Sequence, residues 1–124
     1  MHTIQFDLED RTFKLAKKIG IFCKYLPRTI ANIEYIKQLI RSSGSVGANY
    51  MEANEGSSKK DFVFRLKVCR KEIKETIYWI QLIVSINNLQ STPELQEILS
   101  EATQLKLIFS AAIKNTERGM SVIR

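Results

Sequence analysis

Apolar residues that recur at alternating spacings of three and four constrain this chain more than any other feature. Over residues 58–88 one such row continues for several turns, through Phe62, Leu66, Cys69, Ile73, Thr76, Ile80 and Ile83. This spacing places the side chains along one side of an α-helix, and no segment alternates with the period of two that a half-buried strand needs. The sequence therefore predicts an all-α fold.

Helix start and stop signals divide the chain into four segments. Proline occurs only at positions 27 and 93, and Pro27 is expected to end the first helix because it has no N–H for the hydrogen-bond ladder. The predicted N-caps are Thr29, Ser57 or Ser58, and Thr92, and the predicted terminator of the last helix is Gly119. We expect helices over about 7–26, 29–54, 58–88 and 93–118. Their short connections predict a single domain over residues 1–124, folded as an up-down-up-down antiparallel four-helix bundle.

The other three helices carry apolar rows of the same kind. The predicted rows are Leu15, Ile19, Phe22 and Leu26 beside Phe13, Ala16, Gly20 and Cys23; Ile33, Ile36, Ile40, Ser43, Gly47, Tyr50 and Asn54; and Leu95, Ile98, Ala102, Leu105, Phe109, Ala112 and Thr116. Cys23 and Cys69 both fall within such patterns, so we expect buried thiols and no disulfide.

The run SSGSVGAN, residues 42–49, consists almost entirely of small side chains. A Walker phosphate loop requires a different glycine spacing, a following Lys-Ser/Thr and a preceding strand. A KH-type GxxG clamp also belongs to a fold with strands. The run therefore predicts a helix, regular or kinked, whose small side chains let a neighbouring backbone approach closely.

Positive charge is concentrated in the first half of the chain. Residues 11–74 hold fifteen Lys and Arg against five Asp and Glu, within a formal net charge of +6 for the chain. The candidate nucleic-acid-binding residues lie on the third predicted helix: Lys59, Lys60, Lys67, Arg70, Lys71 and Lys74. We expect this face to bind phosphates through counterion release, with no aromatic residue among its lysines. The alternative is a solvated helix face that serves only solubility.

Catalytic and metal-binding motifs are not found. The single histidine, His2, is near the start of the chain, and no Cys or Glu pattern matches a zinc or di-metal site. We therefore predict no cofactor, no metal and no enzymatic activity. The sequence has neither a signal-peptide pattern nor an apolar stretch long enough to cross a bilayer, so we expect a cytoplasmic chain without membrane attachment.

Residues 45–83, SVGANYMEANEGSSKKDFVFRLKVCRKEIKETIYWIQLI, resemble the four-helix-bundle family of proteins encoded in 23S rRNA intervening sequences. The resemblance implies a small bundle that assembles into a ring, commonly a homopentamer, and it implies no defined biochemical role. The motif residues that we single out in this stretch are Gly47, Asn49, Glu52, Glu75, Tyr78 and Trp79. Helix faces predict a hydrogen-bonded layer of Asn49, Glu52, Glu75 and Tyr78 between the second and third helices. Trp79 is expected in the core or at a subunit interface, and a base-stacking platform is the less favoured interpretation.

Two functional hypotheses follow. The first is a non-enzymatic oligomeric bundle that binds nucleic acid, structured RNA in particular, through the basic face of the third helix. The second is a protein–protein adaptor that binds its partner through exposed apolar residues, with Tyr35, Tyr50 and Phe64 as candidates. Self-association is also expected because the third helix has apolar residues outside its main row, namely Val63, Ile77, Trp79, Leu82 and Ile86.

Overall fold

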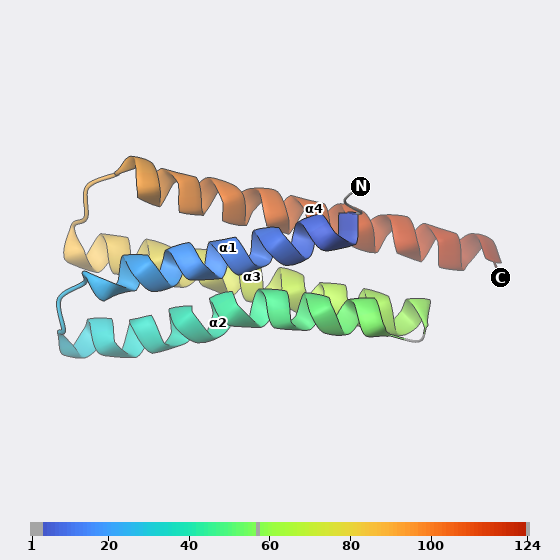
Figure 1. Cartoon of the computed structure of the whole chain (residues 1–124), viewed down its shortest axis with the longest axis horizontal. Coiled ribbons are helices and arrows are strands. Elements are labelled where there is room, and N and C mark those ends of the chain that lie inside the picture. Colours follow the sequence, from blue (N-terminus) through green and yellow to red (C-terminus); the bar gives the residue numbers. More distant parts are fainter. Residues whose placement is uncertain (1–3, 57, 124) are drawn as a thin grey trace.

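The chain folds as four long antiparallel helices. The computed structural model describes residues 4–56 and 58–123, and the side chains of residues 7–56 and 58–120. The helices are α1 (Ile4–Lys24), α2 (Ile30–Glu55), α3 (Lys59–Asn87) and α4 (Pro93–Ile123). The α1–α2 and α3–α4 connections lie at one end and the α2–α3 connection lies at the other, so the predicted up-down-up-down bundle is confirmed (Figure 1). No described helix is long and apolar enough to cross a membrane.

Side-chain caps start three of the helices at the predicted residues. The hydroxyl of Thr29 accepts a hydrogen bond from the backbone N–H of Asn32 at 3.1 Å, and that of Ser58 accepts one from Asp61 at 3.0 Å. Thr92 does the same for Leu95 at 3.2 Å. Each bond satisfies a backbone donor that has no partner within the helix.

The predicted end of α4 at Gly119 is wrong. The helix continues to Ile123, and Gly119 does not adopt a positive φ. Packing accounts for the difference: Met120 is partly buried against the core, and Glu117 forms an ion pair with Lys67 of α3 at 3.2 Å. These contacts hold the last turns in helical form, although glycine would permit the chain to leave the helix.

The core contains most of the predicted rows, and Ser43 and Tyr50 of the predicted α2 row are buried, but the first half of α2 buries a different side than predicted. Leu39 and Val46 are fully buried, whereas Ile33 and Ile40 of the predicted row are exposed. The α2 side that faces α3 carries small groups: Ser42 is buried, and its hydroxyl lies 2.9 Å from that of Thr76. Small side chains permit closer helix packing than an isoleucine row does, so the isoleucines point outward.

Phe13 of α1 is likewise exposed, contrary to the prediction. Cys23 and Cys69 are buried free thiols, as predicted.

The small-residue run is a continuous part of α2, without a break or a positive φ. A Cβ at Gly47 would lie only 2.9 Å from Oγ1 of Thr12, so α1 approaches α2 closely at this glycine. On the other side of the run, the Cys69 thiol of α3 donates a hydrogen bond to the carbonyl of Val46 at 3.5 Å. The prediction of a close-packed helix is therefore confirmed at Gly47. A Cβ at Gly44, in contrast, would meet nothing within 4 Å.

Ionic contacts join α1 to α4 at the surface of the bundle. Arg11 donates two hydrogen bonds to the carboxylate of Glu101, at 2.9 and 2.7 Å, and Lys18 pairs with Glu97. The hydrogen bond to Glu101 raises the pKa of Arg11, because it stabilises the charged guanidinium.

Candidate nucleic-acid interface

The α3 face opposite the core presents lysines to solvent. The buried residues Leu66, Cys69 and Ile73 fix the rotation of α3, so the opposite side of the helix is exposed. Lys60, Lys71 and Lys74 lie there, and within the described part of the chain none of the three forms an ion pair. Their ammonium groups are therefore available to an anionic ligand.

The other three predicted cations lie at the boundary with α4. Lys67 pairs with Glu117 at 3.2 Å, and partly buried Arg70 donates a weak hydrogen bond to Ser110 at 3.5 Å. The ammonium of Lys59 is 3.8 Å from the position that a Cβ at Gly119 would occupy. The structure thus divides the predicted set into three unpaired lysines and three cations beside α4.

Antiparallel pairing adds a cation outside the six predicted ones. Because Arg70 lies opposite Ser110, a step of four residues along each helix places Lys106 of α4 opposite Lys74 of α3. Lys106 is partly exposed. Only the register of α3 against α4 identifies it, since Lys106 is distant from the basic segment in sequence.

Two exposed aromatic residues share the lysine face, which corrects the expectation that it has none. Phe64 and Tyr78 are 60% and 57% exposed. Their positions complete a row with spacings of four and three, which we call the outer row: Lys60, Phe64, Lys67, Lys71, Lys74 and Tyr78. The spacing rule that located the core also identifies this row, although the sequence pattern predicts a partner surface for Phe64 and a polar layer for Tyr78.

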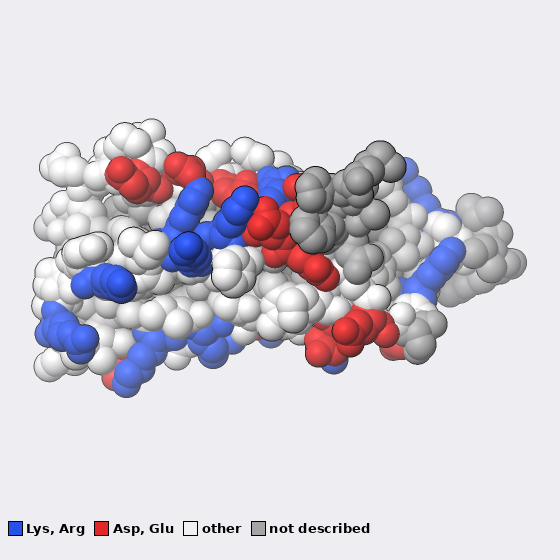
Figure 2. Space-filling model, in the orientation of Figure 1, with Lys and Arg blue, Asp and Glu red and all other residues white. Residues whose placement is uncertain are grey.

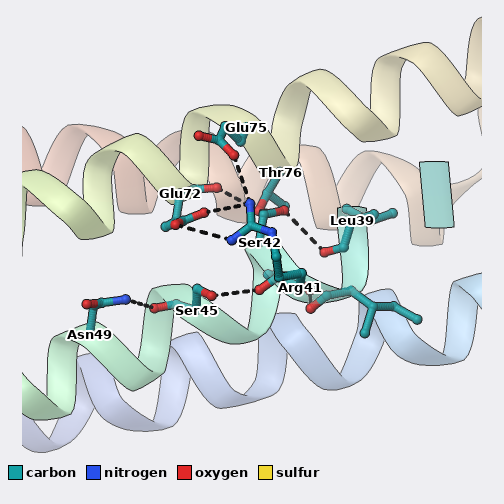
Figure 3. A network of polar contacts seen from close by, with 10 residues as sticks. Leu39, Arg41, Ser42, Ser45, Asn49, Glu72, Glu75 and Thr76 are labelled. Atoms are coloured by element: carbon teal, nitrogen blue, oxygen red, sulfur yellow. Dashed lines mark hydrogen bonds and ion pairs between the residues drawn. The ribbon is translucent and has the colours of Figure 1, made fainter. Parts of the chain in front are cut away.

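A polar network joins α2 and α3 beside the outer row (Figure 3). Arg41 contacts Glu75 at 2.9 Å and buried Glu72 at 3.3 Å. The hydrogen bond to Glu72 is the main reason that the pKa of Arg41 is raised. Because Arg41 pairs with both carboxylates from the α2 side, neither Glu72 nor Glu75 forms an ion pair with Lys71 or Lys74.

The remaining motif residues occupy different environments. Asn49 accepts a hydrogen bond from Arg65 of α3 at 3.1 Å, so Asn49 and Glu75 both bridge α2 and α3. Glu52 is exposed, and Tyr78 points away from this layer into solvent. Trp79 is partly buried and stacks on Tyr35 with ring centroids 5.9 Å apart. Of the proposed partner-surface residues, Tyr50 is buried, whereas Phe64 is exposed.

The face that carries α1 has mixed charge (Figure 2). Asp and Glu lie close to Lys and Arg along this helix, as in the pairs Asp10–Lys14 at 2.8 Å and Asp7–Arg11 at 3.9 Å. Within the described ranges, no group of three or more His, Cys, Asp or Glu is placed to hold a metal ion. The outer row of α3 is therefore the best candidate for binding an anion.

Comparison with known proteins agrees with the fold. The family model for the 23S rRNA-intervening sequence protein matches residues 5–111. A crystal structure of a Bacteroides thetaiotaomicron protein, described as an S23 ribosomal protein family member of unknown function, is similar with a TM-score of 0.76 and 28% identity. The match covers 86% of this chain and 97% of the other. No curated protein matches the chain. The extent of the family match establishes that the chain belongs to the 23S rRNA-intervening sequence protein family.

Proposed function

We propose that the protein binds nucleic acid, with structured RNA as the favoured class, through the α3 face and without catalysing a reaction. The observation that carries this proposal is the set of exposed, unpaired lysines Lys60, Lys71 and Lys74. The family description names an rRNA intervening sequence, which makes RNA the first ligand to test. A cytoplasmic location agrees with two unpaired thiols, since a reducing compartment keeps cysteines in that form.

Counterion release supplies the affinity of such a face. Each lysine that contacts a phosphate releases a condensed cation, so the logarithm of the binding constant falls linearly with the logarithm of the salt concentration. Removing three phosphate contacts is expected to reduce that slope by about 3. The same change weakens binding to every sequence, because contacts to phosphates do not read bases.

A charge-matched pair of variants tests the proposal. One variant reverses Lys60, Lys71 and Lys74 to glutamate, and the control reverses three exposed α1 lysines, Lys14, Lys17 and Lys24. Both have the same net charge. Fluorescence anisotropy with a labelled RNA hairpin over a range of salt concentrations should show a large loss of affinity and slope for the first variant and a small loss for the control. Equal losses would refute the proposed face, because net charge alone would then account for binding.

We also propose that the protein self-associates through an apolar face of α1 and α2. Phe13, Ile40 and Met51 are all at least half exposed. Between them, Cβ atoms at Gly20 and Gly44 would meet nothing within 4 Å, so neither glycine is required by packing within the chain. A second helix packed on this face would bury the apolar groups, and both glycines would allow its backbone to approach closely. The family resemblance suggests a homopentamer.

Sedimentation velocity of an Ile40→Lys variant tests this second proposal. The unmodified protein is expected to sediment as an oligomer and the variant as a smaller species, because a buried ammonium disrupts an apolar interface. Leu107→Lys on α4 is the control, since Leu107 is 61% exposed on another helix. A parent protein that is monomeric at all concentrations would refute self-association. It would leave the face open to a different protein, as the adaptor hypothesis requires.

A further inference from the structure

We propose that the outer row of α3 binds unpaired nucleotides, with Phe64 and Tyr78 stacking on bases while the lysines between them contact phosphates. This inference rests on the nucleic-acid-binding function proposed above and specifies which part of an RNA the site recognises. The ligand is a single-stranded segment, such as the loop of a structured RNA.

The fold does not require aromatic rings at these positions. α3 packs against its neighbours through the opposite row, where Leu66, Ile73 and Ile80 are almost completely buried. Phe64 and Tyr78 contribute little to that core, since more than half of each residue is exposed. Exposed aromatic residues within a row of lysines are what a single-strand binding surface requires, because every unpaired base has a face available for stacking.

Neighbouring side chains support both rings. Tyr78 meets Trp79 edge to face with centroids 5.0 Å apart, and Trp79 in turn stacks on Tyr35 of α2. The guanidinium carbon of Arg65 lies 5.8 Å from the ring centroid of Phe64, and Arg65 is itself anchored to Asn49. Restrained rings lose less side-chain entropy when a base stacks on them than freely rotating ones would.

The dimensions of the row fit a short single strand. Phe64 and Tyr78 are fourteen residues apart, which corresponds to about 21 Å along a helix. Roughly six nucleotides cover that distance at the stacked spacing of about 3.4 Å, and fewer do so when the strand is extended. Lys67, Lys71 and Lys74 lie between the two rings. A duplex would use the lysines but not the rings, because its bases are already stacked on one another.

An anionic membrane surface is the other ligand that attracts lysines and aromatic residues. Helices that lie in a membrane interface bury a broad apolar face along their length. Here the two rings are separated by three lysines and by about 21 Å, which is roughly four helical turns, so the outer row lacks such a face. The arrangement favours a polymer with alternating phosphates and flat bases.

Three ring variants test the inference: Phe64→Ala with Tyr78→Ala, the same pair changed to leucine, and Tyr25→Ala as the control. Tyr25 is 83% exposed and lies outside the outer row. The probes are labelled oligouridine, a blunt RNA duplex and vesicles that contain phosphatidylserine. We expect the double alanine variant to weaken oligouridine binding by roughly fivefold or more for each ring removed and to leave duplex binding unchanged. The double leucine variant should bind oligouridine as weakly as the alanine variant, because leucine is apolar but cannot stack as a flat ring. The control should bind like the parent.

The outcomes separate this inference from the function on which it rests. If reversal of the lysines weakens all nucleic-acid binding and the ring variants bind oligouridine like the parent, the stacking inference is wrong and the function survives. If leucine restores binding, apolar contact replaces stacking and the inference is again wrong. If the lysine reversals leave nucleic-acid binding unchanged, the proposed function and the stacking inference are both wrong. Binding to vesicles but to neither RNA would assign the row to a membrane surface and overturn both.

Discussion

Replacing Gly44 and Gly47 by alanine, one at a time, should change the stability of the protein in opposite directions. Both glycines lie in the interior of α2, three residues apart. A Cβ at Gly44 would meet nothing within 4 Å, whereas a Cβ at Gly47 would lie 2.9 Å from Oγ1 and 3.4 Å from Cβ of Thr12. Thr12 is buried, and its hydroxyl donates a hydrogen bond to the carbonyl of Leu8 at 2.8 Å.

The size of each effect follows from these surroundings. Alanine in place of glycine stabilises a helix interior by about 0.5–1 kcal/mol, and Gly44→Ala should gain this in full. At Gly47 the same gain is opposed by overpacking, which costs about 1–3 kcal/mol, because α1 must move or Thr12 must rotate away from its hydrogen bond. We therefore expect Gly47→Ala to destabilise the protein by up to about 2 kcal/mol.

Urea denaturation followed by circular dichroism measures both effects. Each variant is studied at several protein concentrations, so that any change in self-association at Gly44 is separated from the stability of the chain. Thr12→Ala provides the control for Gly47, because it removes the Oγ1 that a new Cβ would crowd. The Thr12→Ala, Gly47→Ala double variant should be more stable than the sum of the single changes predicts.

A single result would refute this reasoning. If Gly47→Ala stabilises the protein as much as Gly44→Ala does, α1 does not approach α2 closely at Gly47. The small-residue run would then have no packing role at that position.

Three further predictions concern the core and its polar groups. Phe109→Ala should lower the free energy of unfolding by about 3–5 kcal/mol in urea denaturation, since it empties a fully buried site. Arg41→Met should destabilise the protein by about 1–3 kcal/mol, because buried Glu72 loses its cation, and adding Glu72→Met should restore stability in the same assay. Burial raises the pKa of Cys23 to about 11 and that of Cys69 to about 12, above the ordinary 9.0. These thiols hold their protons more tightly in the folded state, so their contribution to stability is complete below pH 9 and is lost as the pH rises towards 11 and 12. The urea concentration at the denaturation midpoint should therefore decrease as the pH is raised beyond 9. A thiol reagent at neutral pH should label the native protein slowly and the unfolded protein fast.

Local chemistry determined the helices and most of their starts. The alternating spacing in α3 predicted both its length and its buried side, and the hydroxyls of Thr29, Ser58 and Thr92 cap their helices as expected. These features depend on residues within a few positions of one another, so a sequence contains the necessary information. The end of α4 depended on contacts with α3 instead, and the glycine at position 119 gave the wrong signal.

The tertiary structure decided which of two neighbouring rows is buried. In α2, Ile40 and Leu39 are similar in hydrophobicity and adjacent in sequence, but only Leu39 is buried. The close approach of α1 and α3 to the small residues of α2 decides which of the two is buried. This packing exists only when all three helices are in place. The same applies to the candidate site, because the sequence contains Phe64 and Tyr78 at the right spacing but does not show that they are exposed. The sequence by itself thus determined which segments are helical, since that depends on local spacing and caps. Only the packed bundle determined which side of each helix remains available to a ligand, since that depends on the shape of its neighbours.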